Sequence, residues 1–278
     1  YPKAGENNPT MSIFVVNVKR GNRKKMSIGD NHDTYYPWIK WTNNSALKVM
    51  RMNRLQNHWD LLNVSIKNGK SIKGLSESDP KGWVELHRNY FFLKDDKILW
   101  LSERSGWHHI YIHNSNGEKI RQLTSGKWEV KRIIKVDESN NKIFFTANKE
   151  SVFETKFYSV NFDGSNLTLL TNEPGSHSVK ILPNGDAFID SYSSLVSPVK
   201  HVLKNMDGDV IKVISETSKS QFDLYDWSYP EIIQFNSSDA TTKLDGIITY
   251  PPDYKKGKRY PVIVHGYGMP GTQIVTNR

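Results

Sequence analysis

Short hydrophobic stretches alternate with short polar turns along most of the chain. Four times, two such stretches flank a turn rich in Asn, Asp, Gly or Ser, residues that tolerate a tight or left-handed backbone. The pattern predicts four β-hairpins. Their strands and turns are Trp38–Trp41, Thr42–Ser45 and Leu47–Met50; Tyr90–Leu93, Lys94–Lys97 and Ile98–Leu101; Ile133–Val136, Asp137–Asn141 and Ile143–Phe145; and Val179–Leu182, Pro183–Asp186 and Ala187–Ile189.

Each hairpin is followed by a third strand, a glycine turn and a short fourth strand. Asn-Gly and Asp-Gly pairs favour type I′ turns, so we expect that turn type here. Four strands per unit and a period of roughly 45–50 residues are typical of β-propeller blades. The third strands are Trp59–Ile66, His108–His113, Lys156–Phe162 and Lys200–Asn205, and the turns contain Asn68-Gly69, Asn116-Gly117, Asp163-Gly164 and Asp207-Gly208.

A large β-sandwich is the alternative all-β fold, but a sandwich would not repeat the same turn chemistry in register. Residues 12–28 resemble the last two strands of one further blade, so we expect the chain to begin inside a propeller. The predicted fold class is therefore mainly β. A partial β-propeller of about four blades plus part of another, residues 1–229, precedes the first strands of an α/β-hydrolase domain, residues 230–278.

The composition changes at Pro230, and this change motivates the second domain. Two further strands, Glu231–Phe235 and Leu244–Tyr250, lead to the apolar run Tyr260–His265 and a glycine-rich loop. Such a run is typical of a central strand buried on both faces. A buried strand that enters a glycine-rich loop forms one side of the oxyanion hole in α/β-hydrolases.

No Gly-x-Ser-x-Gly sequence occurs in the 278 residues. A Ser-His-Asp triad also needs an acid and a histidine after the nucleophile, and the chain leaves no room for them. We therefore expect the chain to stop before the catalytic serine and to be inactive by itself.

The net charge of +9 raises the question of nucleic-acid binding. The basic residues cluster only at Lys19–Lys25, Lys131–Lys135 and Lys255–Arg259, where we expect turns and strand edges. Lysine at an edge opposes edge-to-edge pairing, and no nucleic-acid reader motif accompanies the charge. No apolar run approaches the ~20 residues that span a bilayer. Neither nucleic acid nor a membrane span is predicted for this part.

The chain contains no cysteine. Secreted animal proteins of this size usually contain disulfides, so a bacterial or cytosolic origin is favoured. The start at Tyr1 shows no signal peptide, although processing would remove one. We expect the periplasm or the exterior of a bacterium, with the cytoplasm as the alternative.

Motifs along nearly the whole chain resemble the prolyl oligopeptidase family of serine peptidases, and within it the dipeptidyl peptidase IV branch. They occur in the order found in that family. They are Tyr1–Gly5 with Asn8-Pro9, Arg54–Asn57, Gly82–Val84, Ser102–Trp107 with His109–Tyr111, Leu123–Val130 and Tyr260–Pro270.

The resemblance implies an eight-bladed propeller that covers an α/β-hydrolase domain and gates a shared cavity. It implies release of N-terminal dipeptides, Xaa-Pro or Xaa-Ala, from a peptide substrate. The family's glutamate pair, which binds the substrate ammonium, lies upstream of Tyr1, and its Ser, Asp and His lie downstream of Tyr267. The alternatives are a stand-alone propeller that binds peptides or proteins, with a degenerate hydrolase remnant, and a relative of prolyl endopeptidase or acylaminoacyl peptidase.

Tyr267 matches the family tyrosine whose hydroxyl donates to the oxyanion in acyl transfer. The alternative is a tyrosine packed in a glycine-rich loop, and the matching frame Val264–Pro270 favours the catalytic role. After this tyrosine the family more often has Gly-Pro or Ala-Gly-Pro. Met269 departs from that pattern, and the departure can change the shape of the loop.

Arg88 matches a family arginine that faces the extended substrate pocket, and His87 stands where phenylalanine is usual. Arginine offers several fixed donors for peptide carbonyls. The alternative for Arg88 is a solvated charge at a strand edge, and the two interpretations are evenly balanced. The evidence for His87 is weaker.

The remaining motif residues carry no predicted chemistry. Trp107, Trp128 and Glu129 are assigned to blade cores or blade–blade contacts. His108 and His109 would point to opposite faces of a strand, which disfavours a shared metal ion. We predict no metal site and no cofactor. The predicted partner is a peptide substrate, and a homodimer is considered for the parent protein.

Overall fold

The computed structural model describes residues 2–29, 32–43, 46–269 and 271–278. Tyr1 and Pro270 of the motifs above, and Asn44 and Ser45 of the first predicted turn, lie outside these ranges. The chain divides into two compact units, Tyr1–Ser125 and Gly126–Arg278.

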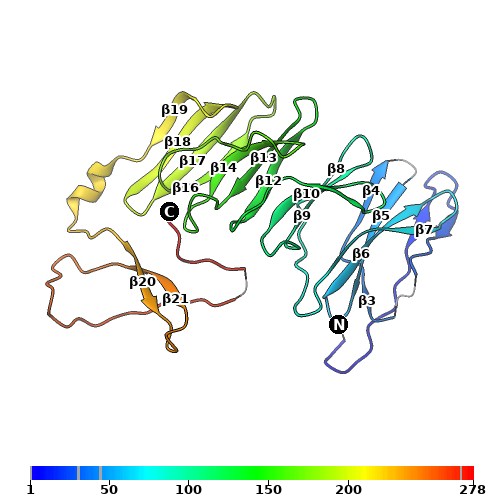
Figure 1. Cartoon of the computed structure of the whole chain (residues 1–278), viewed down its shortest axis with the longest axis horizontal. Coiled ribbons are helices and arrows are strands. Elements are labelled where there is room, and N and C mark those ends of the chain that lie inside the picture. Colours follow the sequence, from blue (N-terminus) through cyan, green and yellow to red (C-terminus); the bar gives the residue numbers. More distant parts are fainter. Residues whose placement is uncertain (1, 30–31, 44–45, 270) are drawn as a thin grey trace. The chain divides into compact units, whose positions relative to one another are not determined.

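The first unit consists of three antiparallel sheets (Figure 1). A two-stranded sheet comes first, then a five-stranded sheet in which β3 and β4 both pair with β5, then a four-stranded meander. The strands are β1 (Phe14–Val16), β2 (Arg23–Lys25), β3 (Thr34–Tyr35), β4 (Ile39–Asn43), β5 (Ala46–Asn53), β6 (His58–Ser65), β7 (Ser71–Ser78), β8 (Phe91–Phe92), β9 (Ile98–Ser102), β10 (His109–His113) and β11 (Lys119–Gln122).

The second unit contains two four-stranded meanders and a hairpin, β20–β21. A 3₁₀ turn, η1, precedes the hairpin. No helix in the described ranges has the length and apolarity to cross a membrane. The elements are β12 (Val130–Asp137), β13 (Lys142–Ala147), β14 (Lys156–Asn161), β15 (Thr168–Leu169), β16 (Ser176–Ile181), β17 (Ala187–Ser194), β18 (Ser197–Asn205), β19 (Val210–Glu216), η1 (Lys219–Leu224), β20 (Glu231–Asn236) and β21 (Lys243–Ile248).

The repeat predicted from the sequence is confirmed. Each of the four predicted units forms one antiparallel sheet, and β1–β2 supplies the two strands expected within residues 12–28. These sheets are propeller blades: four blades and part of a fifth. The two strands predicted after Pro230 are β20 and β21.

Blades stack because their central strands are apolar on both faces. In β5, Leu47 and Val49 belong to a buried cluster with Met26, whereas Met50 and Met52 belong to another that includes Trp100 of β9. Successive residues of a strand point to opposite faces, so this sequence buries both sides. Each fully buried apolar side chain contributes about 1.5–3 kcal/mol. In the second unit, Phe144, Phe157, Leu170 and Phe188 form the equivalent cluster.

The predicted type I′ turns are wrong. Gly117, Gly164 and Gly208 have positive φ, as expected, but the Asn or Asp before each is not among the residues with positive φ. Each glycine N–H donates to the carbonyl of Asn114, Asn161 or Asn205, three positions earlier. That pattern is a type I turn followed by a glycine bulge. The asparagine at the turn's first position drives this choice, since its Oδ1 accepts backbone N–H bonds, as Asn205 does from Asp207 at 3.1 Å and Asp209 at 2.8 Å.

The same glycines also permit close contact between neighbouring blades. A Cβ on Gly117 would lie 2.3 Å from backbone atoms of Gly74 and Leu75, and one on Gly208 would lie 2.6 Å from the Leu170 carbonyl oxygen. Only glycine fits such a backbone approach.

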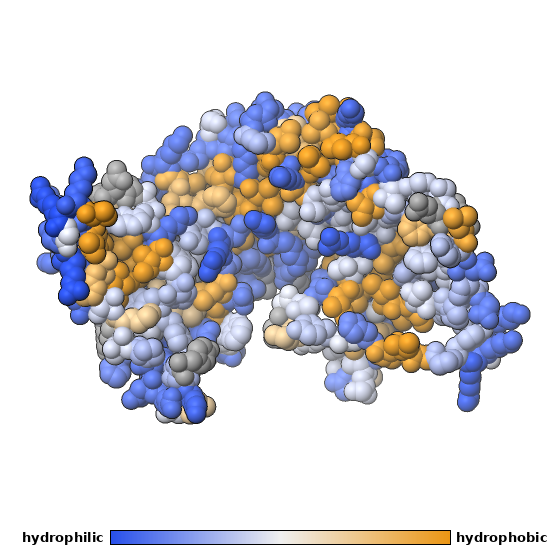
Figure 2. All heavy atoms as spheres, turned by 180° about the vertical axis from the view of Figure 1, so that it is seen from behind, coloured by the Kyte–Doolittle hydropathy of each residue, from blue (hydrophilic) through white to orange (hydrophobic). Residues whose placement is uncertain are grey.

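Some apolar residues remain at the surface (Figure 2). The edge strand β19 is exposed along its length, including Val210, Ile211, Val213 and Ile214.

Candidate functional site

Tyr267 lies in the segment that follows β21, on a loop at the surface. Its side chain is 52% exposed. Its hydroxyl donates a hydrogen bond to the Met269 Sδ, 2.8 Å away. A thioether is a weak acceptor, so the hydroxyl can donate its hydrogen bond to a stronger acceptor instead at little cost. Met269, the departure from the family frame, is therefore the residue that now holds the phenol.

The prediction that Tyr260–His265 forms a buried central strand is wrong for this structure. No strand is present there, and Val262, Ile263 and Val264 are 79%, 99% and 87% exposed. A parallel central strand needs hydrogen-bonded neighbours on both edges. The described residues place no strand beside this run. The apolar sequence shows that this run is suited to burial, but it does not determine which strands would pair with it.

His87 lines a cavity of about 260 Å³ in the first unit, together with Trp59, Trp83 and Trp100. The Leu101 carbonyl accepts a hydrogen bond from the His87 Nε2, at 2.6 Å, which leaves Nδ1 as an acceptor. That Nδ1 is buried and has no hydrogen-bond partner. Burial lowers the pKa of His87 to about 4, against the Leu101 bond, which raises it. His87 is therefore neutral at pH 7.

Arg88 does not share this environment. It is exposed, and the cavity lining does not include it. The structure therefore separates the two neighbouring residues, and a substrate role for Arg88 stays a prediction.

The other motif residues divide between core and surface. Trp128 is buried and stacks on Phe145, which confirms its assignment to a blade core. The same assignment is wrong for Trp107, which is 37% exposed, because it lies in the loop between β9 and β10. His109 is buried against Thr124, whereas His108 lines the cavity, so the two point apart as predicted.

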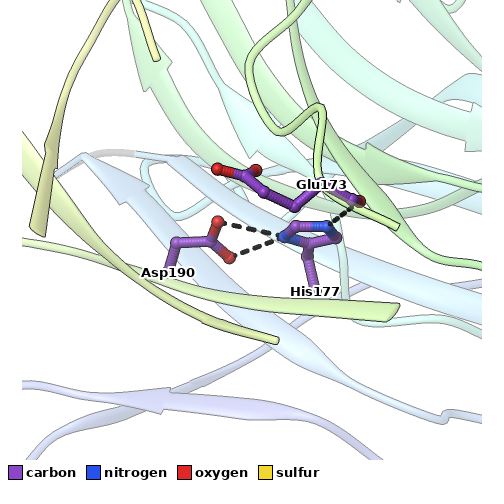
Figure 3. A group of neighbouring side chains, drawn as sticks. All are labelled: Glu173, His177 and Asp190. Carbon is purple, nitrogen blue, oxygen red and sulfur yellow. Dashed lines mark hydrogen bonds and ion pairs between the residues drawn. The ribbon is translucent and has the colours of Figure 1, made fainter. Parts of the chain in front are cut away.

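A buried ionic cluster in the second unit was not found from the sequence; Figure 3 shows three of its four residues, Glu173, His177 and Asp190. We use this name for His177, Asp190, Glu173 and Lys204. Asp190 accepts from the His177 Nδ1 at 2.9 and 3.0 Å, and the Glu173 carbonyl accepts from Nε2 at 2.9 Å. Both ring nitrogens therefore face acceptors.

His177, Asp190 and Glu173 offer ligand atoms within 4.8 Å of one another, as a metal site would. Lys204, however, places its ammonium 2.8 and 2.7 Å from the Glu173 carboxylate oxygens and 3.2 Å from Asp190. It supplies the positive charge that the carboxylates need. Burial acts to raise the pKa of Glu173, but the hydrogen bonds from Lys204 outweigh it and the pKa is lowered. The cluster is thus arranged as an ion-pair network.

Comparison with known families identifies the chain. Residues 1–199 match the family described as Dipeptidyl peptidase IV (DPP IV) N-terminal region. The chain belongs to the dipeptidyl peptidase IV family. The match covers most of the four blades and confirms the resemblance inferred from the motifs.

Curated relatives of this dipeptidyl peptidase IV family chain are similar over its full length. Dipeptidyl peptidase 4 of Arthroderma otae is 28% identical over 289 aligned residues, which cover 99% of this chain and 37% of the relative. Dipeptidyl peptidase 4 of Trichophyton rubrum is 27% identical with the same coverage. The chain thus spans little more than a third of these relatives.

Solved structures agree. The crystal structure of Porphyromonas gingivalis dipeptidyl peptidase 4 matches with a TM-score of 0.90 and 28% identity, over 100% of this chain and 40% of that chain. A putative dipeptidyl aminopeptidase IV from Bacteroides ovatus matches with a TM-score of 0.84 and 26% identity, over 100% and 42%. Since the curated relatives above are fungal and these two are bacterial, the predicted bacterial origin is not established.

Proposed function

We propose that this dipeptidyl peptidase IV family chain is part of a serine exopeptidase that releases N-terminal dipeptides, Xaa-Pro or Xaa-Ala, from peptides. The observation that carries the proposal is the similarity of the whole chain to dipeptidyl peptidases 4, at 28% identity and a TM-score of 0.90 for the one from Porphyromonas gingivalis.

Two parts with different tasks are proposed. Residues 1–229 would form the propeller part and would shape and gate the substrate cavity, and residues 230–278 would begin the hydrolase domain. Because no Gly-x-Ser-x-Gly occurs in these residues, the nucleophile, acid and histidine would come from the rest of the full-length protein. The 278-residue chain alone is expected to be inactive.

Tyr267 is proposed as an oxyanion-hole donor. Acyl transfer places negative charge on the carbonyl oxygen of the scissile bond, and a preorganised O–H donor stabilises that charge. Exchange of the Met269 sulfur for an oxyanion replaces a weak acceptor by a strong one, so the existing hydrogen bond does not oppose the role.

Arg88 and His87 are proposed as contacts for the extended part of the substrate. Exposed guanidinium donors on Arg88 suit peptide carbonyls, and the free Nδ1 of His87 suits a donor such as a peptide N–H. A homodimeric parent and a periplasmic or extracellular location stay predictions.

The test uses the full-length protein and a Gly-Pro or Ala-Pro amide. Tyr267→Phe is expected to lower kcat about 10²- to 10³-fold, the usual effect of losing one oxyanion donor. Tyr254→Phe, at another half-exposed tyrosine in the same part of the chain, is the matched control and should leave kcat unchanged. Equal kcat for wild type and Tyr267→Phe would remove Tyr267 from the mechanism.

A further inference from the structure

The end of the chain docks on two blades through Asn277. Its backbone N–H donates to the Phe153 carbonyl at 2.8 Å, and its Nδ2 donates to the Glu154 Oε1 at 2.6 Å. Its Oδ1 accepts from the Leu195 N–H at 2.9 Å. Phe153 and Glu154 belong to the β13–β14 loop and Leu195 to the β17–β18 loop, so one residue bonds to two blades; the marked C-terminus lies beside β16 in Figure 1.

Gln273 makes a second contact with the same β13–β14 loop. Its Nε2 donates to the Val152 carbonyl and, at 3.0 Å, to the Val275 carbonyl. Residues 273–277 are therefore held at both ends.

Glu154, the acceptor for Asn277, is itself fixed from the blade side. The Gly175 N–H donates to its Oε1 at 2.9 Å, and Lys156 lies 3.2 Å from its Oε2. Burial acts to raise the pKa of Glu154, but the bonds from Asn277, Gly175 and Lys156 outweigh it and the pKa is lowered. Lys156 is buried and also donates to the Glu173 carbonyl, so these bonds continue into the ionic cluster.

Tyr267 has no comparable support of its own. It is exposed, and its hydroxyl bonds only to Met269 among the hydrogen bonds of the described residues. Asn277 follows it by ten residues (277 − 267). Among the residues that the structure describes, 273–277 are thus the first after Tyr267 with hydrogen bonds to the blade loops.

We infer that Asn277 is a positioning residue for the oxyanion donor: with Glu154 and Leu195 it fastens the Tyr267 loop to the blades. The inference rests on the proposed function, because it gives Tyr267 a catalytic role. A group displaced by about 1 Å can lose about 10²-fold in rate. Loosening this attachment should therefore lower kcat more than it raises KM.

The decisive variant is Asn277→Asp in the full-length protein. It places a carboxylate against the Glu154 carboxylate while keeping the acceptor for Leu195. We expect kcat on a Gly-Pro amide to fall about 10- to 100-fold. Combining it with Glu154→Gln removes one of the two facing carboxylate charges and should restore part of the lost kcat. Asn22→Asp, at an exposed asparagine far from Asn277 in the sequence, is the control and should leave kcat unchanged.

A second measurement ties the effect to Tyr267. In a Tyr267→Phe background, Asn277→Asp should cost less than about threefold, since the group it positions is gone. If Asn277→Asp fails to fold, Gln273→Ala serves instead, with the same expected loss and the same loss of effect beside Tyr267→Phe.

The outcomes separate the two proposals. A wild-type full-length protein that does not cleave the amide overturns the proposed function. An active wild type whose folded Asn277→Asp and Gln273→Ala variants keep their kcat overturns the positioning role alone. So does a loss of equal size in the Tyr267→Phe background.

Discussion

At the scale of single residues, one backbone carbonyl determines how His87 can act. The Leu101 oxygen accepts a hydrogen bond from the Nε2–H, so the remaining nitrogen is an acceptor inside the Trp-lined cavity. The family's usual phenylalanine would fill the same space without that acceptor. His87 therefore gives this cavity a hydrogen-bond acceptor that phenylalanine lacks.

His87 also predicts a dependence of stability on pH. The unfolded chain binds a proton near pH 6.5, but folded His87 binds one only near pH 4, so stability falls as the pH drops through this window. His113, whose pKa burial also lowers to about 4, acts in the same direction. Replacing His87 by Phe in the full-length protein should therefore flatten the fall of Tm between pH 6.5 and 4 without removing it. Identical slopes for the two proteins would contradict this assignment.

Lys204 carries the largest stability effect that we expect from one side chain. Removing a buried ion-pair partner leaves uncompensated charge, which costs about 3–5 kcal/mol. Lys204→Met should lower the free energy of unfolding in urea by that amount, because Asp190 and Glu173 both lose their ammonium. Lys212→Met, at an exposed lysine of β19, should change it by less than about 0.5 kcal/mol. Comparable losses for both would show that the cluster is not a stabilising network.

The sequence could not reveal this cluster. Glu173 lies in a loop, His177 and Asp190 on β16 and β17, and Lys204 on β18, so only strand register brings them together. The weak signal was an ionisable residue directly after a short apolar run: Asp190 follows Ala187–Ile189, and Lys204 follows Val202 and Leu203. Tyr267 and His87 were found because motifs place them, whereas Asn277 belongs to no motif that we recognised.

At the scale of elements, the two ends of a blade have different roles: one contacts the neighbouring blade, and the other carries the candidate site residues. The glycine turns between third and fourth strands face the neighbouring blade's backbone, as Gly117 and Gly208 do. The other end carries the loops between second and third strands and the links between blades. His87 lies in one such link, between β7 and β8, and the loop that binds Asn277 joins a second strand to a third.

A substitution at Gly208 tests the blade end that carries the glycine turns. An alanine there meets both a left-handed backbone, φ 96°, and the Leu170 carbonyl oxygen. Gly257, with φ 90° and nothing within 4 Å, has the backbone strain alone. Gly257→Ala should therefore cost about 1–2 kcal/mol, and Gly208→Ala about 1–3 kcal/mol more, measured by urea unfolding of the full-length protein. Equal losses for the two variants would show that the close contact between Gly208 and Leu170 does not affect stability.

Strand order was predictable from hydrophobic periodicity, since every predicted hairpin is present. Turn type was not, because the dipeptide rule ignored the asparagine at the turn's first position, as at Asn114 and Asn205. The run Val262–Val264 was misplaced for a different reason: composition indicates burial, but pairing depends on which strands lie alongside.

At the scale of the whole molecule, the chain supplies blades and one candidate catalytic group. It spans 37% of dipeptidyl peptidase 4 from Arthroderma otae, so the activity that we propose is assigned to the full-length protein. The stand-alone binding module and the prolyl endopeptidase or acylaminoacyl peptidase relative differ from our proposal in where, or whether, a peptide is cut.

One measurement separates them most directly. The full-length protein is incubated with a peptide that begins Ala-Pro, with its N-terminus free or acetylated, and the products are identified by mass spectrometry. We predict that the free peptide loses its first two residues as a dipeptide and that the acetylated peptide stays intact. Cleavage of the acetylated peptide, internally or by removal of its blocked first residue, would contradict the account, as would no cleavage of either peptide.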